Sequence, residues 1–587
     1  MQLIQIGGKV SLQSLSGAEF DVVVVGAGNA GMSAALYAAI EGARVLLVER
    51  TSHVGGSSAL SGGTTWVPCT HHGATVNPDD TLENVERYLD HAVGTRSSAA
   101  VRRAFLQNGP EAVRHIEANS DVKYRVVPRH PDYTSDLPGA TVCGRALEPM
   151  PFDGRLLGDL FSLVRPPINE FMVLHGMMVD RIDIPHLLAP FKSFASLRHV
   201  LKILGRHFSD RVFRGYPRST RLVMGNALVA RQLYSLSKRD NVTLAMETEV
   251  EQMHAGAGGV EAVTLHHNGQ RATVKVRGGV ILASGGFNRH PELRKTMLPG
   301  IDPGWCPGAP GHTGQAHDVA KQLGARYGQD AMSHGFWAPV SIRRRYDGSR
   351  AVFPHFVFDR AKPGMITVNQ EGERFLNEST SYHLFGIAMQ EANKSKPSIP
   401  GWLICDADAM HKYGMGMVRP QEKNLEPYLA DGYLTRASSL DELASKIGVS
   451  AAKLRKSVEQ INSYAERGED PDFGRGRTLY QQNLGDPNWG GKNPSIGPIK
   501  KAPFFAMRLY PGDIGAATGF ETTPDACVIG EGGQPIGGLY AVGNDMHSIT
   551  GGTYPAPGIT LGPGLVFAYL AARHAVRRAR TPDALAA

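Results

Sequence analysis

Two short apolar runs near the start of the chain flank a stretch of small residues. Asp21–Val25 is a β-branched run typical of a strand buried on both faces, and Ala43–Val48 is a second apolar run. The Ala-rich segment Met32–Glu41 between them predicts a helix. Glycines and charges interrupt the hydrophobicity, so the pattern predicts strand, turn, helix and strand and not a membrane span.

The turn before this helix has the spacing of a dinucleotide-binding loop, Gly26-Ala-Gly28-Asn29-Ala30-Gly31. Gly26 suits a tight turn, Gly28 lets the backbone approach a diphosphate, and Gly31 lets the helix pack on the strand. The helix N-terminus favours the diphosphate charge. Glu49, followed by Arg50, ends the second strand, where a carboxylate would accept hydrogen bonds from ribose hydroxyls.

A second loop of small residues follows Glu49 at once and indicates a longer cofactor. A nicotinamide dinucleotide has little use for such a loop here, whereas FAD extends past its diphosphate. The residues expected along FAD in this loop are Gly55, Gly56, Ser57, Ser58, Ser61, Gly62 and Gly63. Further contacts are expected at Val250, Gly285, Gly286, Gly543, Asn544, Gly558 and Leu561. We expect FAD to be bound non-covalently, with His53 lining the loop.

Later apolar segments suggest that the cofactor domain is split in sequence. Gly279–Phe287 and Gly537–Asn544 predict buried strands, and Pro563–Arg573 predicts a helix. We therefore expect an α/β fold: a Rossmann-type FAD-binding domain with an inserted α+β substrate or catalytic domain. The predicted division is 18–288 (with a lid-like insertion, 150–222), 289–495 and 496–580. The tail after Thr581 is expected to fray.

Composition narrows the function classes. The 587 residues include 68 glycines, and 62 basic against 55 acidic residues give a net charge of +7. No long basic run accompanies this mild charge, so no nucleic-acid partner is expected. Five cysteines without metal-type spacing exclude a disulfide scaffold and predict no metal, which favours a reducing, cytoplasmic setting.

The segment from Phe191 to Arg211 has apolar residues at near-helical spacing with basic residues between them. A basic amphipathic helix of this kind can make peripheral contact with an anionic membrane surface. The same pattern also fits a lid or a domain-packing helix whose charges are solvated.

Three tyrosines stand in distinctive contexts: Tyr133 in HPDY (130–133), Tyr382 in GERFLNESTSY (372–382) and Tyr554 in GGTYPAPGITLGPG (551–564). With these motifs the chain resembles the 3-ketosteroid Δ1-dehydrogenases, flavoproteins of the wider succinate dehydrogenase and fumarate reductase group. The likeness covers about Phe20 to Ala575. It is supported by GGLYAVGN (537–544) and HVGGSSALSGGTTWVP (53–68).

The resemblance implies roles for four catalytic residues in desaturating a ring ketone. Tyr554 and the N–H of Gly558 would bind and polarise the ketone oxygen. Tyr382 would take the proton from the α carbon, Tyr133 would help to ionise that base, and flavin N5 would accept hydride from the β carbon. An enolate needs such donors in a dry site, and a tyrosine base needs help to ionise. The implied partners are a steroid or other ring-ketone substrate and an external electron acceptor.

Departures from the family pattern leave the substrate open. Ser381 stands where the steroid enzymes often have Pro, Ala556 stands where they have Gly, and the region 150–222 is long. A monocyclic ketone such as 4-oxocyclohexanecarboxylate is the alternative substrate, with Arg145 or Arg165 binding its carboxylate or simply lying solvated at the surface. A hypothesis of another class is a flavin electron-transfer or binding subunit, but such a subunit needs no base or enolate site. The sequence predicts no oligomeric state.

Overall fold

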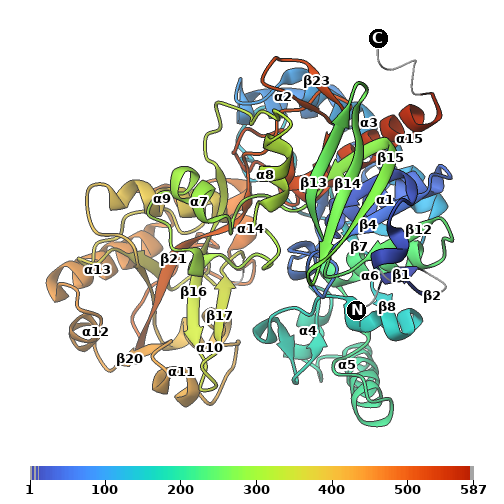
Figure 1. The fold of residues 1–587 in the computed structure, drawn as a ribbon. Coiled ribbons are helices and arrows are strands. Elements are labelled where there is room, and N and C mark those ends of the chain that lie inside the picture. Colours follow the sequence, from blue (N-terminus) through green and yellow to red (C-terminus); the bar gives the residue numbers. More distant parts are fainter. Residues whose placement is uncertain (1–2, 6–7, 11, 358, 582–587) are drawn as a thin grey trace.

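The computed structural model describes residues 3–5, 8–10, 12–357 and 359–581. Two sheets lie side by side in Figure 1 and differ in strand direction. The larger sheet has a parallel centre, and the smaller sheet is antiparallel. The chain has the mixed α/β architecture that the sequence predicted.

Strand β3 (Glu19–Val25) is the centre of the larger sheet and pairs in parallel with β4 (Val45–Val48) and β15 (Gln270–Leu282). All but the first of its residues are buried, as expected for a β-branched strand covered on both faces. Parallel neighbours extend the centre on both sides, namely β12 (Val242–Ala245) on β4 and β23 (Pro535–Ala541) on β15. The remaining strands are β1 (Leu3–Gln5), β2 (Gly8–Val10), β13 (Glu249–Gly256), β14 (Gly259–His267) and β22 (Cys527–Ile529).

Two helices from opposite ends of the chain pack against one another beside this sheet. They are α1 (Asn29–Ile40) and α15 (Leu561–Arg580), and α15 also contacts α3 (Ala99–Asn119). Helix α1 follows the glycine loop after β3, and α15 follows a glycine-containing loop after β23. Helix α6 (Met224–Ser237) contacts α1 as well.

The antiparallel sheet has six strands and supports α9 (Tyr382–Asn393). Its strands are β16 (Gly335–Arg344), β17 (Arg350–Pro354), β18 (Met365–Val368), β19 (Gly401–Cys405), β20 (Thr435–Ala437) and β21 (Phe504–Ala516). Around it lie α7 (Pro291–Met297), α10 (Ala407–Tyr413), α11 (Glu426–Ala430), α12 (Leu440–Ile447), α13 (Ala451–Arg467) and α14 (Leu479–Leu484).

Strand β21 departs from the predicted division of the chain. Everything after residue 495 was assigned to the cofactor domain, but β21 pairs with β16, β19 and β20 of the antiparallel sheet. The Gly- and Pro-rich stretch 489–498, at the predicted boundary, is a loop that leads into β21. We therefore propose that the chain returns to the cofactor domain after Ala516.

The bounds of two other elements, β15 and α15, also differ from the prediction. Strand β15 ends at Leu282, so the small residues up to Phe287 form turns and not strand. Helix α15 begins two residues before Pro563 and continues to Arg580. The predicted frayed tail lies outside the described residues.

The region 150–222 forms a small subdomain of short strands and two helices, α4 (Asp183–Leu188) and α5 (Phe194–Phe208), at the bottom of Figure 1. Val164 bridges to Val54 of the cofactor loop. On the other side, Glu170 accepts hydrogen bonds from Arg345 of the antiparallel-sheet region at 2.7 Å. The subdomain therefore contacts both major parts of the molecule.

Its short strands are β8 (Phe152–Asp153), β9 (Met172–Val173), β10 (Met177–Met178) and β11 (Arg221–Leu222). The remaining described α-helices and strands are α2 (Leu82–Val93), α8 (Gln315–Lys321), β5 (Thr65–Trp66), β6 (Tyr124–Val126) and β7 (Ala146–Pro149). In the described part of the chain, no helix combines the length and apolarity needed to cross a membrane.

Candidate functional site

The three glycines of the loop before α1 have three different surroundings. Gly26 has φ +104°, and a Cβ there would lie 2.3 Å from the carbonyl oxygen of Ala283. A Cβ at Gly31 would lie 1.8 Å from the carbonyl oxygen of Gly26. At Gly28 the nearest atom is 4.0 Å away, the hydroxyl of Ser58. Gly26 and Gly31 are therefore needed for protein packing, whereas Gly28 leaves open space at the N-terminus of α1.

The second small-residue loop lies against the first. The N–H of Gly55 donates to the carbonyl oxygen of Ala27 at 2.7 Å, and that of Asn29 donates to the Ser58 hydroxyl at 3.2 Å. A Cβ at Gly56 would lie 3.8 Å from the Cα of Gly28. The nearest atom to a Cβ at Gly62 is 3.9 Å away. Open backbone therefore continues from Gly28 along this loop.

Other predicted residues of the second loop serve its own structure. The Ser61 hydroxyl donates to the carbonyl of Ser58 at 2.8 Å and accepts from the N–H of Gly63 at 3.1 Å. A Cβ at Gly63 would lie 2.7 Å from the backbone of Gly225 at the start of α6. The Ser57 hydroxyl accepts from the N–H of Ala309 at 2.9 Å.

Helix α15 brings the end of the chain to the same place. The side-chain amide of Asn29 donates to the carbonyl oxygen of Leu561 at 3.2 Å. A Cβ at Gly543 would lie 3.0 Å from the Cβ of Ala30. The N-termini of α1 and α15 therefore meet, and both favour negative charge nearby.

Glu49 caps the strand end beside the loop. Its carboxylate accepts from the N–H of Ala27 at 3.0 Å and from the N–H of Thr51 at 2.8 Å. Its neighbour Arg50 pairs with Glu249 at 3.3 Å. The carbonyl oxygen of Val250 accepts from the side chain of Gln315 at 3.0 Å.

His312 is a buried residue beside the predicted cofactor loops that sequence reasoning missed. Its ring lies 3.8 Å from the position of a Cβ at Gly56 and 2.5 Å from that at Gly285. Burial lowers its pKa to about 4, and its buried Nδ1 has no hydrogen-bond partner among the described residues. Asp545 accepts from the N–H of the neighbouring Gly286 at 2.7 Å. A neutral ring with an unmatched polar atom, beside open glycines and a helix N-terminus, fits a bound dinucleotide.

The three tyrosines expected at the reacting end come together in a buried aromatic cluster. Tyr133 donates a hydrogen bond to the hydroxyl of Tyr382 at 3.1 Å. The ring of Tyr554 lies 5.2 Å from that of Tyr382 and 5.8 Å from that of Tyr133. The ring of Tyr480, a residue that sequence reasoning missed, has its centre 4.6 Å from the centre of the Tyr133 ring.

Backbone contacts hold this cluster to the loop that contains Tyr554. The N–H of Tyr133 donates to the carbonyl oxygen of Pro555 at 2.7 Å. The indole N–H of Trp66 donates to Asp132 at 3.0 Å, and the N–H of the same residue donates to the carbonyl oxygen of Gly558 at 3.1 Å. Trp66 therefore ties together the two segments that contain Tyr133 and Gly558.

Arg145 braces Asp132 and is not free to bind a substrate. Its guanidinium bonds to Asp132 at 2.7 Å and to Asp80 at 2.6 Å, and the residue is 2% exposed. Arg165 instead bonds to Thr51 beside the cofactor loop at 2.8 Å. The expectation that Arg145 is either a carboxylate ligand or a solvated residue is therefore wrong, because the fold uses it to neutralise two buried carboxylates.

Tyr382 is the first residue of α9, and Ser381 caps that helix. The Ser381 hydroxyl accepts from the N–H of Leu384 at 3.3 Å, which gives a reason for a serine where related sequences often have proline. The helix N-terminus carries partial positive charge. Tyr382 therefore stands in the first turn of a helix, at the end where negative charge is tolerated best.

Arg360 is a buried cation beside the cluster, and no local motif marks it in the sequence. Its guanidinium donates to the backbone carbonyls of His355 at 3.0 Å and Phe356 at 3.1 Å, and also to those of Glu378 and Thr380. The last two precede Tyr382 in the chain. Burial lowers the pKa of Arg360, while the nearby tyrosines and Asp359 raise it.

Burial dominates the ionisation of the cluster. It raises the pKa of Tyr382 and of Tyr133 well above the ordinary tyrosine value, and it also raises that of Tyr554. Arg360 lowers the pKa of Tyr133. His383, next to Tyr382, has its pKa lowered to about 3 by burial, so its ring is neutral at physiological pH.

Gly558 presents an N–H beside this cluster. Its φ is +81°, and a Cβ would lie 2.2 Å from the carbonyl oxygen of Thr64. Among the described residues, no acceptor is bonded to this N–H. The geometry therefore leaves one backbone donor available close to Tyr554 in the chain.

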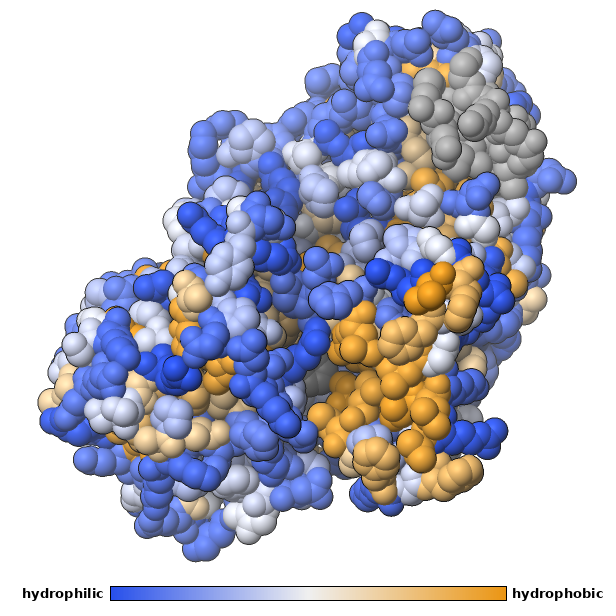
Figure 2. All heavy atoms as spheres, turned by 90° about the horizontal axis from the view of Figure 1, so that it is seen from below, coloured by the Kyte–Doolittle hydropathy of each residue, from blue (hydrophilic) through white to orange (hydrophobic). Residues whose placement is uncertain are grey.

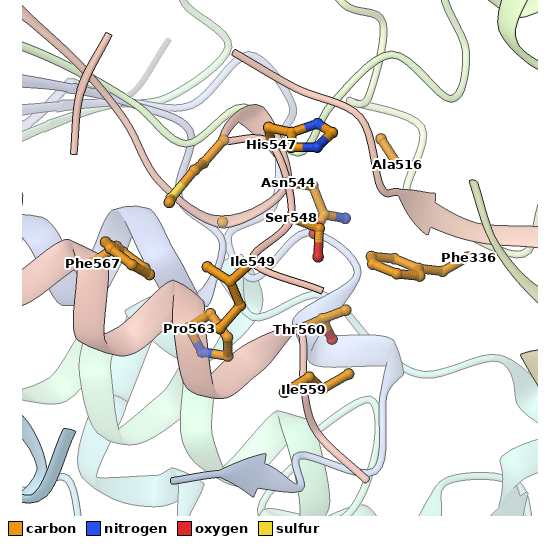
Figure 3. A pocket seen from close by; sticks show the side chains of 12 residues that line it. Phe336, Ala516, Asn544, His547, Ser548, Ile549, Ile559, Thr560, Pro563 and Phe567 are labelled. Atoms are coloured by element: carbon orange, nitrogen blue, oxygen red, sulfur yellow. The ribbon is translucent and has the colours of Figure 1, made fainter. Parts of the chain in front are cut away.

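A small pocket, with a cavity volume of about 20 Å³, lies between the start of α15 and the antiparallel sheet. Figure 3 shows the side chains of Phe336, Asn544 and Thr560 around it. Phe336 also packs edge-on against Tyr554 at 5.1 Å. Phe336 therefore lines this pocket and also contacts the tyrosine cluster.

A separate group of possible metal ligands was not predicted. His71, His72 and Glu117 place their ligand atoms within 4.8 Å of one another. Glu117 lies far along the chain from the histidines, so no spacing signal marks the group. Hydrogen bonds account for these contacts, with Nε2 of His72 2.8 Å from the carboxylate.

Comparison with known proteins gives the family. The model of the FAD binding domain family matches residues 21–561. The chain belongs to this family. FAD is its cofactor, in agreement with the open backbone at Gly28 and the unmatched Nδ1 of His312. The protein is therefore an FAD-dependent oxidoreductase.

Three relatives cover nearly the whole chain. It is 38% identical to 4-oxocyclohex-2-ene-1-carboxylate 5-dehydrogenase of Sinomonas cyclohexanicum, over 95% of this chain and 94% of that protein. It is 33% identical to 3-oxosteroid 1-dehydrogenase of Mycolicibacterium smegmatis, over 95% and 97%. The structure of 3-ketosteroid Δ1-dehydrogenase from Sterolibacterium denitrificans in complex with 1,4-androstadiene-3,17-dione aligns with a TM-score of 0.88 and 34% identity, over 95% and 99%.

Proposed function

We propose that this FAD-dependent enzyme introduces a carbon–carbon double bond α,β to the ketone of a ring substrate. The observation that carries the proposal is the hydrogen bond from Tyr133 to Tyr382, at 3.1 Å, inside a buried cluster that also contains Tyr554. Removing a proton beside a ketone requires a base and donors for the developing enolate. The chain supplies both kinds of group in one place.

Each residue has a separate task in this reaction. The hydroxyl of Tyr554 and the N–H of Gly558 bind the ketone oxygen and polarise it. The Tyr382 hydroxyl oxygen, once ionised, takes the α proton, and the Tyr133 hydroxyl donates to that oxygen and stabilises its charge. Non-covalently bound FAD supplies the acceptor for the β hydride. The residues that would hold FAD include Gly28, His312 and the N-termini of α1 and α15.

We propose a 3-ketosteroid as the substrate, with desaturation at C1–C2. Phe336, Phe356 and Tyr480 surround the three tyrosines, and the neighbouring His383 is neutral. The guanidinium of Arg360 donates its hydrogen bonds to backbone carbonyl oxygens. Such aromatic surroundings, in which the nearby cation of Arg360 is bonded to backbone, suit a neutral apolar ring system better than a carboxylate.

The second candidate is a monocyclic keto acid. The 38% identity to an enzyme named for 4-oxocyclohex-2-ene-1-carboxylate favours it. Such a substrate needs a cation near the site to pair with its carboxylate. Of the two arginines considered for this task, Arg145 is committed to Asp80 and Asp132. Arg165 instead donates to the Thr51 hydroxyl and to the carbonyl oxygen of His53.

A substrate panel tests the proposal. Purified holoenzyme is mixed with androst-4-ene-3,17-dione or with the cyclohexenone carboxylate, and reduction of an artificial electron acceptor is followed. Turnover of the steroid with formation of the 1,4-diene supports the first candidate. Turnover of the keto acid alone supports the second.

An anaerobic experiment separates either reaction from simple electron transfer. Addition of substrate without an acceptor should bleach the flavin absorbance if the protein oxidises it. Flavin that stays oxidised with every ring ketone would instead support an electron-transfer or binding subunit. Denaturation should release the FAD into the supernatant, because no covalent bond is proposed.

A further inference from the structure

The 150–222 subdomain carries most of the large apolar side chains exposed in the described part of the chain. Those with the highest exposure are Phe191 at 86%, Phe213 at 84% and Phe194 at 82%. The others in this region are Met150, Leu156, Leu174, Ile182, Leu188, Leu201, Phe208 and Val212. Figure 2 shows a broad apolar patch on the bottom face of the molecule, where α4 and α5 lie in Figure 1. Apolar patches of this kind mark interaction sites.

Helix α5 attaches to the protein through one of its faces. Ser196, Val200, Ile203 and His207 recur at helical spacing and are all buried. Ser196 contacts His186 of α4 at 3.0 Å. These buried residues are therefore enough to pack α5 against the rest of the protein, and the exposed side chains of the helix are not needed for this packing.

A second apolar stripe on α5 faces away from the protein. Phe194, Leu201 and Phe208 are seven residues apart, which places them on one side of the helix, and each is more than half exposed. Phe191, just before the helix, and Phe213, just after it, extend the stripe at both ends. Solvent exposure of so many apolar groups is unfavourable unless something covers them.

Exposed basic side chains flank this stripe. Lys192, Arg198, Lys202, Arg211 and Arg214 are all exposed. The segment 181–217 contains two carboxylates, Asp183 and Asp210, and both are fully buried. Asp183 pairs with Arg221 at 2.8 Å, and Asp210 accepts from Thr220. The accessible charge of the surface is therefore positive.

We propose that this surface, residues 191–214, docks the protein peripherally on an anionic lipid bilayer. Protruding aromatic rings insert into the boundary between headgroups and acyl chains, while the basic side chains pair with lipid phosphates. A symmetric dimer through the same surface is disfavoured because it would bring Lys192, Arg198 and Lys202 against their own copies. The position of the patch would hold the enzyme next to a phase in which apolar ring ketones dissolve.

Vesicle sedimentation tests the proposal on the holoenzyme. The protein should sediment with phosphatidylcholine vesicles that contain a third of phosphatidylglycerol, and less with phosphatidylcholine alone. High salt should reduce the bound fraction, because lipid phosphates are screened. Equal recovery in the supernatant with and without either vesicle would overturn the proposal.

Two sets of variants separate the contributions. The combination Phe191→Ser, Phe194→Ser and Phe213→Ser should weaken binding about tenfold or more, because the inserted area is lost. The combination Lys192→Gln, Arg198→Gln and Lys202→Gln should abolish the preference for anionic lipid. The control is Tyr346→Ser with Leu479→Ser, two exposed apolar positions outside the patch, which should bind like the unchanged protein.

Turnover of a water-soluble ketone and FAD absorbance should be the same in all variants, which shows that the fold is intact. Vesicle binding does not depend on the identity of the substrate, so failure of docking and failure of the proposed function are distinguishable. A protein that ignores vesicles but changes from dimer to monomer with the phenylalanine substitutions would overturn the lipid proposal in favour of self-association.

Discussion

The hydroxyl of Tyr133 donates to the hydroxyl of Tyr382 at 3.1 Å, although the two residues are 249 positions apart in the chain. Tyr382 is the first residue of α9, which packs on the antiparallel sheet. The backbone N–H of Tyr133 donates to the carbonyl oxygen of Pro555, in the loop that contains Tyr554. The pair therefore joins the two major parts of the molecule. Its chemistry depends on both.

Tyr382→Phe should reduce turnover by about 10²–10⁴-fold, because it removes the proposed base and leaves the aromatic ring in place. Tyr346→Phe, at an exposed site, is the matched control. Acceptor reduction measures turnover, and flavin absorbance measures cofactor content. Turnover near that of the unchanged protein would exclude Tyr382 as the base.

Tyr133→Phe should have a smaller effect, about 10–100-fold, because it removes one hydrogen bond to the ionised base and not the base itself. Its distinguishing mark is the pH profile. Without the Tyr133 hydroxyl, the ionised oxygen of Tyr382 loses its hydrogen-bond donor, so the activity curve should change its position along the pH axis. A uniform loss at every pH would point to a purely structural role.

Activity of the unchanged protein should rise with pH through the neutral and mildly alkaline range. Burial raises the pKa of Tyr382 above its ordinary value, so the ionised fraction grows about tenfold for each pH unit below that pKa. Steady-state kcat/KM across pH, at saturating acceptor, measures this rise. A bell-shaped curve centred near neutrality would contradict it.

Arg360 is expected to act as a positioning residue for Tyr382. Arg360→Met leaves buried carbonyls without donors, at a cost of about 1–3 kcal/mol for each that water cannot reach, and removes a positive charge from the cluster. Arg360→Lys loses the same fork of donors but keeps the charge. Both variants should unfold at lower temperature, but the Met variant alone should shift the pH profile upward. Identical profiles would reduce Arg360 to a structural residue.

The dinucleotide-loop glycines should separate by phenotype. Gly28→Val should weaken FAD binding while leaving the fold intact, because its side chain enters open space. Gly31→Ala should destabilise the fold itself, because its Cβ would lie 1.8 Å from the carbonyl oxygen of Gly26. Circular dichroism and FAD content after purification distinguish the two. Gly532→Ala, where no atom lies within 4 Å, should change neither.

The dinucleotide loop could be recognised from sequence alone, because its elements are adjacent in the chain. A β-branched run, three glycines and an Ala-rich helix lie within about twenty residues, and period and spacing suffice to recognise them. The three tyrosines could be named in advance because each stands in a motif of a known family. The domain limits were harder to predict from sequence. The apolar pattern of β21 would fit a strand of either sheet, and only its pairing partners assign it to the antiparallel one.

Which distant groups come into contact depends on how the whole chain packs. Arg360 and His312 have no local pattern that marks them, since their roles come from what they are buried against. Arg145 could be read as free from sequence because its partners, Asp80 and Asp132, lie at other positions in the chain. Burial and the pairing of remote side chains are properties of the packed chain, so the chemistry of the site follows from the fold.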